Sequence, residues 1–291
     1  MRKVAGARTP STKPHPLVRA PWIENRPQPG WVAELSLREL WSYREVAYQL
    51  ALRDLKVRYK QTAVGVLWVI VQPAAATLVF TLVLGAAAGL PSDGLPYSVF
   101  VLAGLTGWLS ISSSVSAAAE CLVEGRDLVT KSYFPRVLAP VAACLPGLVD
   151  LAPALAALGV LMAIEGVQPS ASILTLPVWI GAGLLVALGA GLWLSALNAL
   201  YRDVRYAIGF VLQIWLFASP VVYPSSLVEG PERSLFALNP LVGVLDGLRW
   251  ALLDAPAPPV QDLASLAVGV LLLVTGLLYF QRVERQMADR I

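Results

Sequence analysis

Long apolar tracts separated by short polar segments dominate the chain. Five tracts contain no Asp, Glu, Lys or Arg, and a sixth is interrupted only by Asp150. Each is long enough to supply the ~20 residues that an α-helix needs to cross a hydrocarbon core. Because lipid offers the backbone no hydrogen-bond partners, the pattern predicts an all-α integral membrane protein with six transmembrane helices. The predicted spans are 64–89, 99–119, 137–164, 173–199, 206–223 and 262–280.

The composition agrees with this interpretation. Of the 291 residues, 57% are hydrophobic and 14% are charged, whereas soluble domains carry about 25% charged residues. A soluble protein with buried helices is a poor alternative, because so little polar surface could not cover a core built from six such tracts. The two cysteines, Cys121 and Cys144, and the single histidine, His15, form neither a disulfide nor a metal-binding pattern.

The basic residues are distributed unevenly among the loops. Twelve of the 22 Lys and Arg residues precede the first predicted span, five lie in the second and fourth loops, and three follow the last span. The first and third loops contain none and the fifth contains two, so 20 of the 22 fall on one side of the membrane. The positive-inside rule assigns that side to the cytoplasm. Both termini are then cytoplasmic, which requires an even number of spans.

The chain before the first span has two segments. Residues 1–35 are rich in proline and have no apolar signal sequence, which is typical of a disordered cytoplasmic tail. Residues 36–60 begin with a capping pattern, Ser36 and Glu39, and predict an amphipathic helix in the cytoplasmic membrane interface. A helix of a small cytoplasmic domain would show the same pattern. The predicted apolar stripe is Leu37, Leu40, Trp41, Tyr48, Ala51, Leu52 and Leu55. Residues 61–291 then form the transmembrane domain.

Two loops are candidates for structure of their own. The second loop, residues 124–136, is short and mixed in charge, and could be either a linker or a docking surface for a cytoplasmic partner. The fifth loop, residues 224–261, holds two apolar pieces, Leu235–Leu245 and Leu248–Leu253, separated by Asp246–Gly247. Because these pieces are too short to span, we expect a hairpin that re-enters the outer leaflet, with a surface loop as the alternative.

Catalytic motifs are missing from the sequence. It contains no G-x-x-x-x-G-K-[ST] phosphate loop, no H-E-x-x-H and no G-x-S-x-G. The one ionisable residue deep in a predicted span is Asp150, between Pro146 and Pro153. A charge that faces lipid costs at least ~2.5 kcal/mol, so Asp150 should face protein or water. It could lie on a translocation path or make a hydrogen bond that packs two helices.

Aromatic residues in the predicted spans are candidates for a channel lining. Sugar rings stack on aromatic faces, so such a lining would suit a glycan. Trp and Tyr also gather at membrane interfaces as anchors, which is the alternative for each of them. The candidates are Trp68, Phe80, Trp108, Trp215, Phe217 and Tyr223.

Three stretches, in order, carry a family resemblance. They are LALRDLKVRYKQTAVGVLWVIVQP at 50–73, EGRDLVTKSYFPRVLAP at 124–140, and NALYRDVRYAIGFVLQIWLFASPVVYP at 198–224, followed by LNPLVGVLDGLRWALL at 238–253. On these stretches the chain resembles the membrane (permease) subunits of type-2 ABC exporters for polysaccharides, the O-antigen, capsule and wall teichoic acid exporter family. The resemblance covers most of residues 37–280, whereas the Pro-rich tail has no counterpart in it.

The resemblance implies a permease without an ATPase site or cofactor of its own. It would act as a homodimer with two copies of a separate ABC ATPase that binds ATP and Mg²⁺, in the bacterial cytoplasmic membrane. The substrate would be a polyprenyl pyrophosphate-linked glycan. The permease would be surrounded by membrane lipid, and it would bind no nucleic acid. The hairpin after Tyr223 would be the outer gate. The second loop would be the coupling helix, with Glu124, Gly125, Arg126, Asp127, Lys131, Tyr133 and Arg136 contacting the ATPase.

Charge and position suggest where the substrate's pyrophosphate would bind. Arg53, Arg58 and Lys60 stand at the predicted cytoplasmic mouth, although positive-inside anchors would carry the same charges. Three other functions stay open. One is a channel or ion-driven carrier, which the lack of buried charge disfavours. A drug or lipid exporter would share this architecture. A membrane-embedded glycosyltransferase would need paired carboxylates or a metal site, whereas the chain has isolated aspartates and no D-x-D motif.

Overall fold

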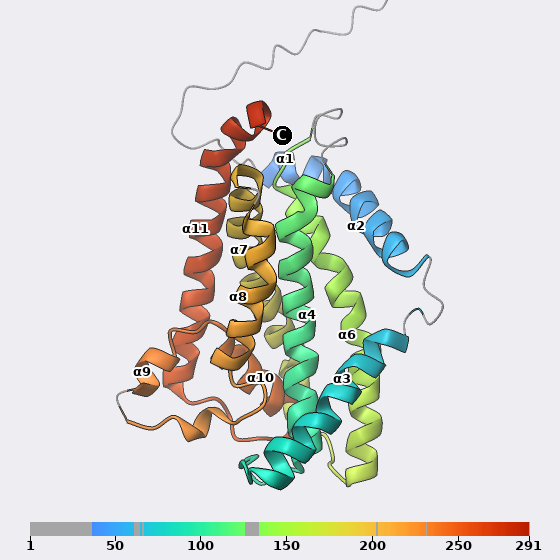
Figure 1. Cartoon of the computed structure of the whole chain (residues 1–291), viewed down its shortest axis with the longest axis vertical. Helices are drawn as coiled ribbons and strands as arrows, with labels where there is room; N and C mark the ends of the chain where they lie inside the picture. Colours follow the sequence, from blue (N-terminus) through green and yellow to red (C-terminus); the bar gives the residue numbers. More distant parts are fainter. Residues whose placement is uncertain are drawn as a thin grey trace, which may run out of the picture. The chain divides into compact units, whose positions relative to one another are not determined.

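The computed structural model describes residues 37–60, 65, 67–125, 134–201, 203–230 and 232–290, with side chains described from 40 to 284 in these ranges. Every regular element within them is a helix, which confirms the predicted all-α fold (Figure 1). The predicted tail and Ser36 lie outside the described residues. The helices are α1 (Leu37–Ser42), α2 (Arg44–Tyr59), α3 (Leu67–Phe80), η1 (Thr81–Ala87), α4 (Tyr97–Glu124), α6 (Leu138–Glu165), η2 (Ala171–Thr175), α7 (Leu176–Leu200), α8 (Val204–Ala218), η3 (Ser225–Leu227), α9 (Glu232–Phe236), α10 (Leu241–Leu253) and α11 (Val260–Arg290).

Five helices of the described part are long and apolar enough to cross a membrane. Each overlaps one of the predicted spans; they are Leu67–Ala87, Tyr97–Glu124, Leu138–Glu165, Ala171–Leu200 and Val260–Glu284. The span predicted at 206–223 is helical only as α8, whose 15 residues rise about 22 Å. The helix ends at Ala218, and the next residue, Ser219, is extended because it precedes Pro220.

The two ends of the bundle differ. Helix α1 and the C-terminal end of α11 lie at one end, which we call the α1 end, and α9 lies at the opposite α9 end (Figure 1). Helix α4 runs between them and packs against α3, α6, α7, α8 and α10. Small residues allow these contacts. A Cβ on Gly147 of α6 would lie 2.2 Å from Ser114 Oγ, and one on Gly191 of α7 would lie 2.6 Å from Ala118 Cβ.

The segment predicted as one amphipathic helix over 36–60 forms two helices, α1 and α2. Of the predicted stripe, Ala51 is buried against the start of α6, but Trp41 and Tyr48 are 70% and 59% exposed. Leu50, which is not in that stripe, is also buried there. The face that packs on the bundle therefore lies beside the predicted one, and the aromatic face of α1 and α2 is left uncovered.

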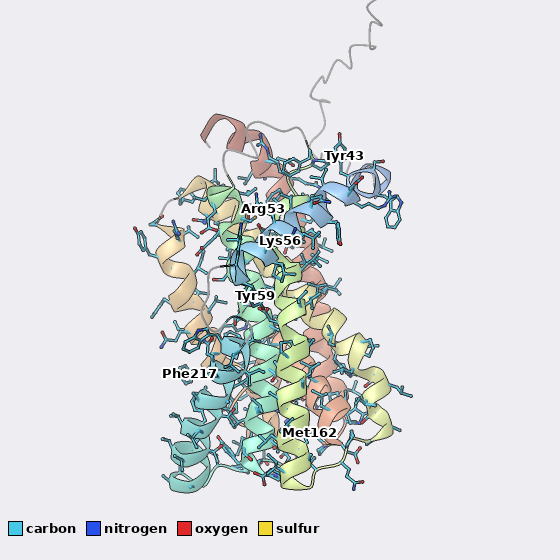
Figure 2. The ribbon with its side chains drawn as sticks, turned by 90° about the vertical axis from the view of Figure 1, so that its right-hand side faces the viewer. Tyr43, Arg53, Lys56, Tyr59, Met162 and Phe217 are labelled. Carbon is cyan, nitrogen blue, oxygen red and sulfur yellow. The ribbon has the colours of Figure 1, made fainter. Side chains whose placement is uncertain are left out.

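Helix α2 slopes along α6 towards the middle of the bundle (Figure 2). Its last residue, Tyr59, hydrogen-bonds Asp150. Asp150 lies about 18 Å along α6 from the first residue of that helix, Leu138. The slope thus carries the polar end of α2 to the depth of the one ionisable residue in α6 that sequence analysis singled out.

At the α9 end, the two apolar pieces predicted in the fifth loop are not separated at Asp246–Gly247. A single helix, α10, runs through this position. Glycine is needed there because a Cβ on Gly247 would lie 2.1 Å from the ring of Trp179 in α7. Most of α10 is buried against α4, α7 and α11. The prediction of a break failed because tertiary packing favours the helix.

Asn239 joins the end of α8 to the start of α10. Its amide nitrogen donates to the carbonyl of Ala218 and to Ser219 Oγ, both at 2.9 Å. Its carbonyl oxygen accepts from Trp215 Nε1 at 3.0 Å and from the Leu241 amide at 3.1 Å. Four hydrogen bonds use the full capacity of this side chain, so the turn between the two helices is held in one arrangement.

Candidate functional site

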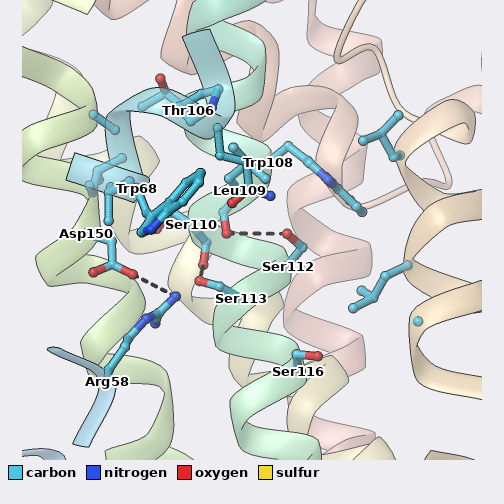
Figure 3. A pocket seen from close by; sticks show the side chains of 18 of the residues that line it. Arg58, Trp68, Thr106, Trp108, Leu109, Ser110, Ser112, Ser113, Ser116 and Asp150 are labelled. Atoms are coloured by element: carbon cyan, nitrogen blue, oxygen red, sulfur yellow. Dashed lines mark hydrogen bonds and ion pairs between the residues drawn. The ribbon is translucent and has the colours of Figure 1, made fainter. Parts of the chain in front are cut away.

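A cavity of about 570 Å³ opens between α3, α4, α6 and α8, beside the end of α2 (Figure 3). This volume is typical of ligand pockets. Ten of the 21 described residues that line the cavity have polar side chains. Its polar residues are Arg58, Tyr59, Gln72, Thr106, Ser110, Ser112, Ser113, Ser116, Asp150 and Gln213, and its aromatic residues besides Tyr59 are Trp68 and Trp108.

Helix α4 supplies the serines of this wall. Ser110 Oγ donates to the Gly147 carbonyl of α6 at 2.8 Å. Ser112 and Ser113 donate to carbonyls three residues earlier in their own helix, at 3.3 and 3.1 Å. Each hydroxyl keeps lone pairs that can accept a further hydrogen bond. The row can therefore accept hydrogen bonds from hydroxyl groups of a ligand while its own protons stay satisfied.

Among the described residues of this wall, the one carboxylate is that of Asp150, which is held by two residues of α2. Arg58 Nη2 lies 2.9 Å from Asp150 Oδ2 (Figure 3). The Tyr59 hydroxyl donates to Asp150 Oδ1. Burial, reinforced by this hydrogen bond, raises the pKa of Tyr59 to about 12, so the phenol keeps its proton. Asp150 therefore lines the cavity and connects α6 to α2 through two side-chain contacts, whereas a place on a translocation path stays a prediction.

The three cations expected at the mouth line two different hollows, which share Tyr59. Arg58 lines the cavity, whereas Arg53, Lys56 and Lys60 line a second hollow of about 660 Å³, whose described wall comes from residues 49–60 alone. Figure 2 shows Arg53 and Lys56 on α2. Arg53 also contacts its neighbour Asp54, at 2.8 Å. Sequence reasoning missed Lys56. Its spacing of three residues from Arg53 and four from Lys60 places all three on one helix face, which would have found it.

The aromatic candidates also divide. Trp68 and Trp108 line the cavity. Trp215 packs edge-on against Trp108, with 6.1 Å between ring centroids, and donates to Asn239. The cavity wall does not include Phe80, Phe217 or Tyr223, all of which are described residues.

Of the predicted coupling residues, the structure describes the two ends of the segment. Glu124 ends α4 and lies 3.6 Å from Arg205 of α8, and Gly125 follows it as the cap. Arg136 donates from Nη1 to the Glu284 carbonyl of α11 at 3.0 Å. The segment is therefore attached to two other helices. Arg126, Asp127, Lys131 and Tyr133 lie outside the described residues.

Sequence reasoning missed a buried polar network at the α9 end. Arg249 donates to the carbonyls of Phe100, Pro220 and Val221 at 3.4, 2.6 and 2.6 Å, and its guanidinium lies 3.8 Å from the centre of the Phe100 ring. Its nearest acid is Asp246, at 3.6 Å. The spacing of these two residues, i and i+3 on one helix, was a signal that could have found the pair.

The second ion pair of this network joins distant parts of the chain. Arg233 Nη2 lies 2.5 Å from Asp262 Oδ2, and its Nη1 donates to the carbonyls of Ser225 and Val228 at 3.0 and 3.3 Å. Asp262 is completely buried. Both arginines thus hold main-chain carbonyls of the segment that follows α8, Arg233 at Ser225 and Val228 and Arg249 at Pro220 and Val221.

Comparison with known proteins gives a consistent set of matches. The family model described as ABC-2 type transporter matches residues 45–253. The O-antigen export system permease protein RfbA of Myxococcus xanthus is 30% identical over 258 residues, which cover 88% of this chain and 98% of that protein. An O-antigen export system permease protein RfbA of Klebsiella pneumoniae is 23% identical over 240 residues, covering 81% of this chain and 91% of that protein.

Proposed function

The chain belongs to the ABC-2 type transporter family, and from this premise we propose that it is the membrane subunit of an ATP-driven exporter of a lipid-linked polysaccharide. The observation that carries the proposal is the match to the O-antigen export permease of Myxococcus xanthus over almost its whole length. A polar cavity with serine and tryptophan side chains supports it, because sugars need both hydrogen bonds and flat apolar faces. A drug or lipid exporter would share the fold but would have less use for such a wall.

Hydrolysis of ATP belongs to a separate subunit in this family. Family membership therefore implies an ABC ATPase as partner. We propose that residues 124–136 contact it as the coupling segment. Glu124 and Arg136 support this proposal, since they connect the ends of the segment to α8 and α11. A displacement of the segment would be transmitted directly to α8, which forms one wall of the cavity.

The proposed topology has six spans, with both termini in the cytoplasm and the α9 end outside. Helix α8, together with the extended residues that follow it, would be the short fifth span. Only an even number of spans keeps the basic residues before the first span and after the last on one side. Helix α10 would be the re-entrant element, since it is buried in the bundle and its 13 residues cannot cross a bilayer.

A homodimer in the bacterial cytoplasmic membrane would cover surfaces that stay exposed in one chain. Helix α8 exposes Tyr206 and Phe210 to 85% and 67%, and α3 exposes Leu78 to 62%. Such faces can meet either lipid or a second copy. We propose that α3 and α8 of two copies enclose the export path, so that the cavity opens onto it. The exposed Trp41 and Tyr48 would rest among lipid headgroups, where amphipathic rings are favoured.

The substrate proposed for this path is a glycan on polyprenyl pyrophosphate. Its pyrophosphate would first meet the basic hollow of α2, where Arg53, Lys56 and Lys60 gather. Arg58 would take it further, at the border of the cavity. The glycan would then follow the serine row of α4.

Purification of this chain in mild detergent, with ATPase activity measured in the eluate, tests the proposal. We expect a P-loop ATPase to co-purify at equal stoichiometry. Arg126→Glu reverses a charge in the coupling segment, so it should uncouple export and lower the ATPase activity of the eluate by about tenfold or more. Arg282→Glu, at an exposed cation outside that segment, is the matched control and should keep the activity. A homo-oligomer without ATPase would contradict the exporter, and a deletion strain with a complete envelope glycan would contradict the cargo.

A further inference from the structure

Two hollows meet at the end of α2, and one residue lines both. Tyr59 belongs to the wall of the cavity and to the wall of the basic hollow. Next to it, the ion pair of Arg58 and Asp150 lies on the cavity wall. An anion that moves from the hollow to the cavity therefore meets this pair. The positions of Lys56 and Lys60 in the hollow favour the arrival of such an anion.

The two members of the pair differ in their access to water. The Arg58 side chain is 38% exposed, whereas the Asp150 side chain is 9% exposed. The Arg58 guanidinium has five N–H donors. Some of them can bind a phosphate while the others stay hydrogen-bonded to water. Arg58 is therefore the partner that can move, and Asp150 is the partner that stays in place.

Asp150 does not lose every partner when Arg58 leaves. The Tyr59 hydroxyl still donates to its carboxylate, and this hydrogen bond lowers the cost of leaving the buried charge without its counter-ion. Arg58 and Tyr59 are adjacent at the last turn of α2 and bind different oxygens of the same carboxylate. This arrangement allows one bond to be exchanged while the other is kept.

We propose that Asp150 is a built-in competitor for Arg58: its carboxylate occupies the guanidinium when no substrate is bound, and a phosphate group of the substrate displaces it to open the cavity. The proposal rests on the proposed function, since it requires a substrate with a phosphate group. It assigns to Asp150 a regulatory role at the border between the two hollows. A chain without this competitor should bind the phosphate more tightly and with less selectivity.

Binding of farnesyl pyrophosphate to the complete transporter in lipid nanodiscs tests this proposal, with farnesol as the probe that lacks phosphate. Asp150→Asn should bind farnesyl pyrophosphate about fivefold more tightly than the unmodified chain, the factor expected for removing the competing charge from an ion pair whose arginine is partly exposed. The gain should vanish in the double variant Asp150→Asn/Arg58→Gln, because it acts through Arg58. Farnesol binding should not change.

Asp54→Asn is the matched control, because it removes the same charge from the carboxylate that contacts Arg53. Any gain from it should persist when Arg58 is Gln. Equal gains for Asp54→Asn and Asp150→Asn, or a gain for Asp150→Asn that survives Arg58→Gln, would overturn the competitor role in favour of general electrostatics. Unchanged or weaker binding by Asp150→Asn would overturn it as well.

A second variant keeps the proposal testable should Asp150→Asn fail to fold. Tyr59→Phe adds no volume and removes the bond that Asp150 keeps after Arg58 has left, so affinity for farnesyl pyrophosphate should fall about threefold. Unchanged affinity would refute the exchange. The proposed function fails separately: if the unmodified chain binds farnesyl pyrophosphate no better than farnesol, the phosphate-bearing substrate is rejected, and the competitor with it.

Discussion

Two ion pairs, one at the α9 end of the bundle and one near its middle, use the same residue types under different conditions. At the α9 end, Arg233 and Asp262 are 2.5 Å apart and their side chains are 17% and 0% exposed. Towards the α1 end, Arg58 and Asp150 are 2.9 Å apart and 38% and 9% exposed. The second pair borders the cavity of about 570 Å³. The same chemistry therefore serves as a fixed clamp in one place and as an exchangeable contact in the other.

The bonds that surround each pair strengthen this contrast. At the α9 end, Arg233 and Arg249 donate to main-chain carbonyls of the loop between α8 and α9, and Arg249 has almost no exposed surface. Those carbonyls have few other donors, so the arginines replace regular secondary structure. Arg58, by contrast, joins the side chain of a different helix and reaches solvent. Loss of a residue at the α9 end should thus cost fold stability, and loss near the cavity should change binding.

Arg249→Met should have the largest effect on stability. It leaves three carbonyls without their donor and Asp246 without its counter-ion, and each unsatisfied buried group costs about 1–3 kcal/mol. We expect a loss of about 5 kcal/mol in the free energy of unfolding, measured by SDS titration in mixed micelles. Arg282→Met, at an exposed position, is the control. A normal unfolding curve for Arg249→Met would mean that water or lipid replaces the guanidinium.

Asp262→Asn should come next, with a loss of about 3 kcal/mol. Removing one partner of a buried pair leaves the other charge uncompensated. The same titration should show that adding Arg233→Gln recovers part of the loss, because both charges are then gone. The loss in free energy of unfolding of the double variant could instead equal the sum of the losses of the two single variants. The carbonyl contacts of Arg233 would then contribute more than the ion pair, and the main role of Arg233 would be to hold the loop.

How far the sequence predicts this molecule depends on how local each feature is. The spans were predictable because lipid forces long apolar runs, and five of them appear as long helices. The register between helices was not, since periodicity within a helix does not say which residue of another helix it meets. Arg58 and Asp150 are 92 residues apart and Arg233 and Asp262 are 29 apart, so neither pair had a local signal.

The faces chosen by packing were equally hard to predict. Helix α2 has apolar residues on more than one face, and only Leu50 and Ala51 are buried. In α10, the break expected at Gly247 disappears because the Trp179 ring occupies the space that a side chain would need. Both outcomes follow from the shape of a neighbouring helix, which the pattern along one segment does not contain.

Asp150→Asn should have the smallest effect on stability, below about 1 kcal/mol. The asparagine still accepts from Tyr59, and Arg58 turns to water because it is partly exposed. Arg58→Gln should cost more, about 2 kcal/mol, because it leaves the buried carboxylate with one partner. This asymmetry, read from the same SDS titration, separates an exchangeable pair from a clamp, in which both single variants are costly. Equal losses for Asp150→Asn and Arg58→Gln would mean that the pair near the cavity is as fixed as the pair at the α9 end, and that substrate could not displace it.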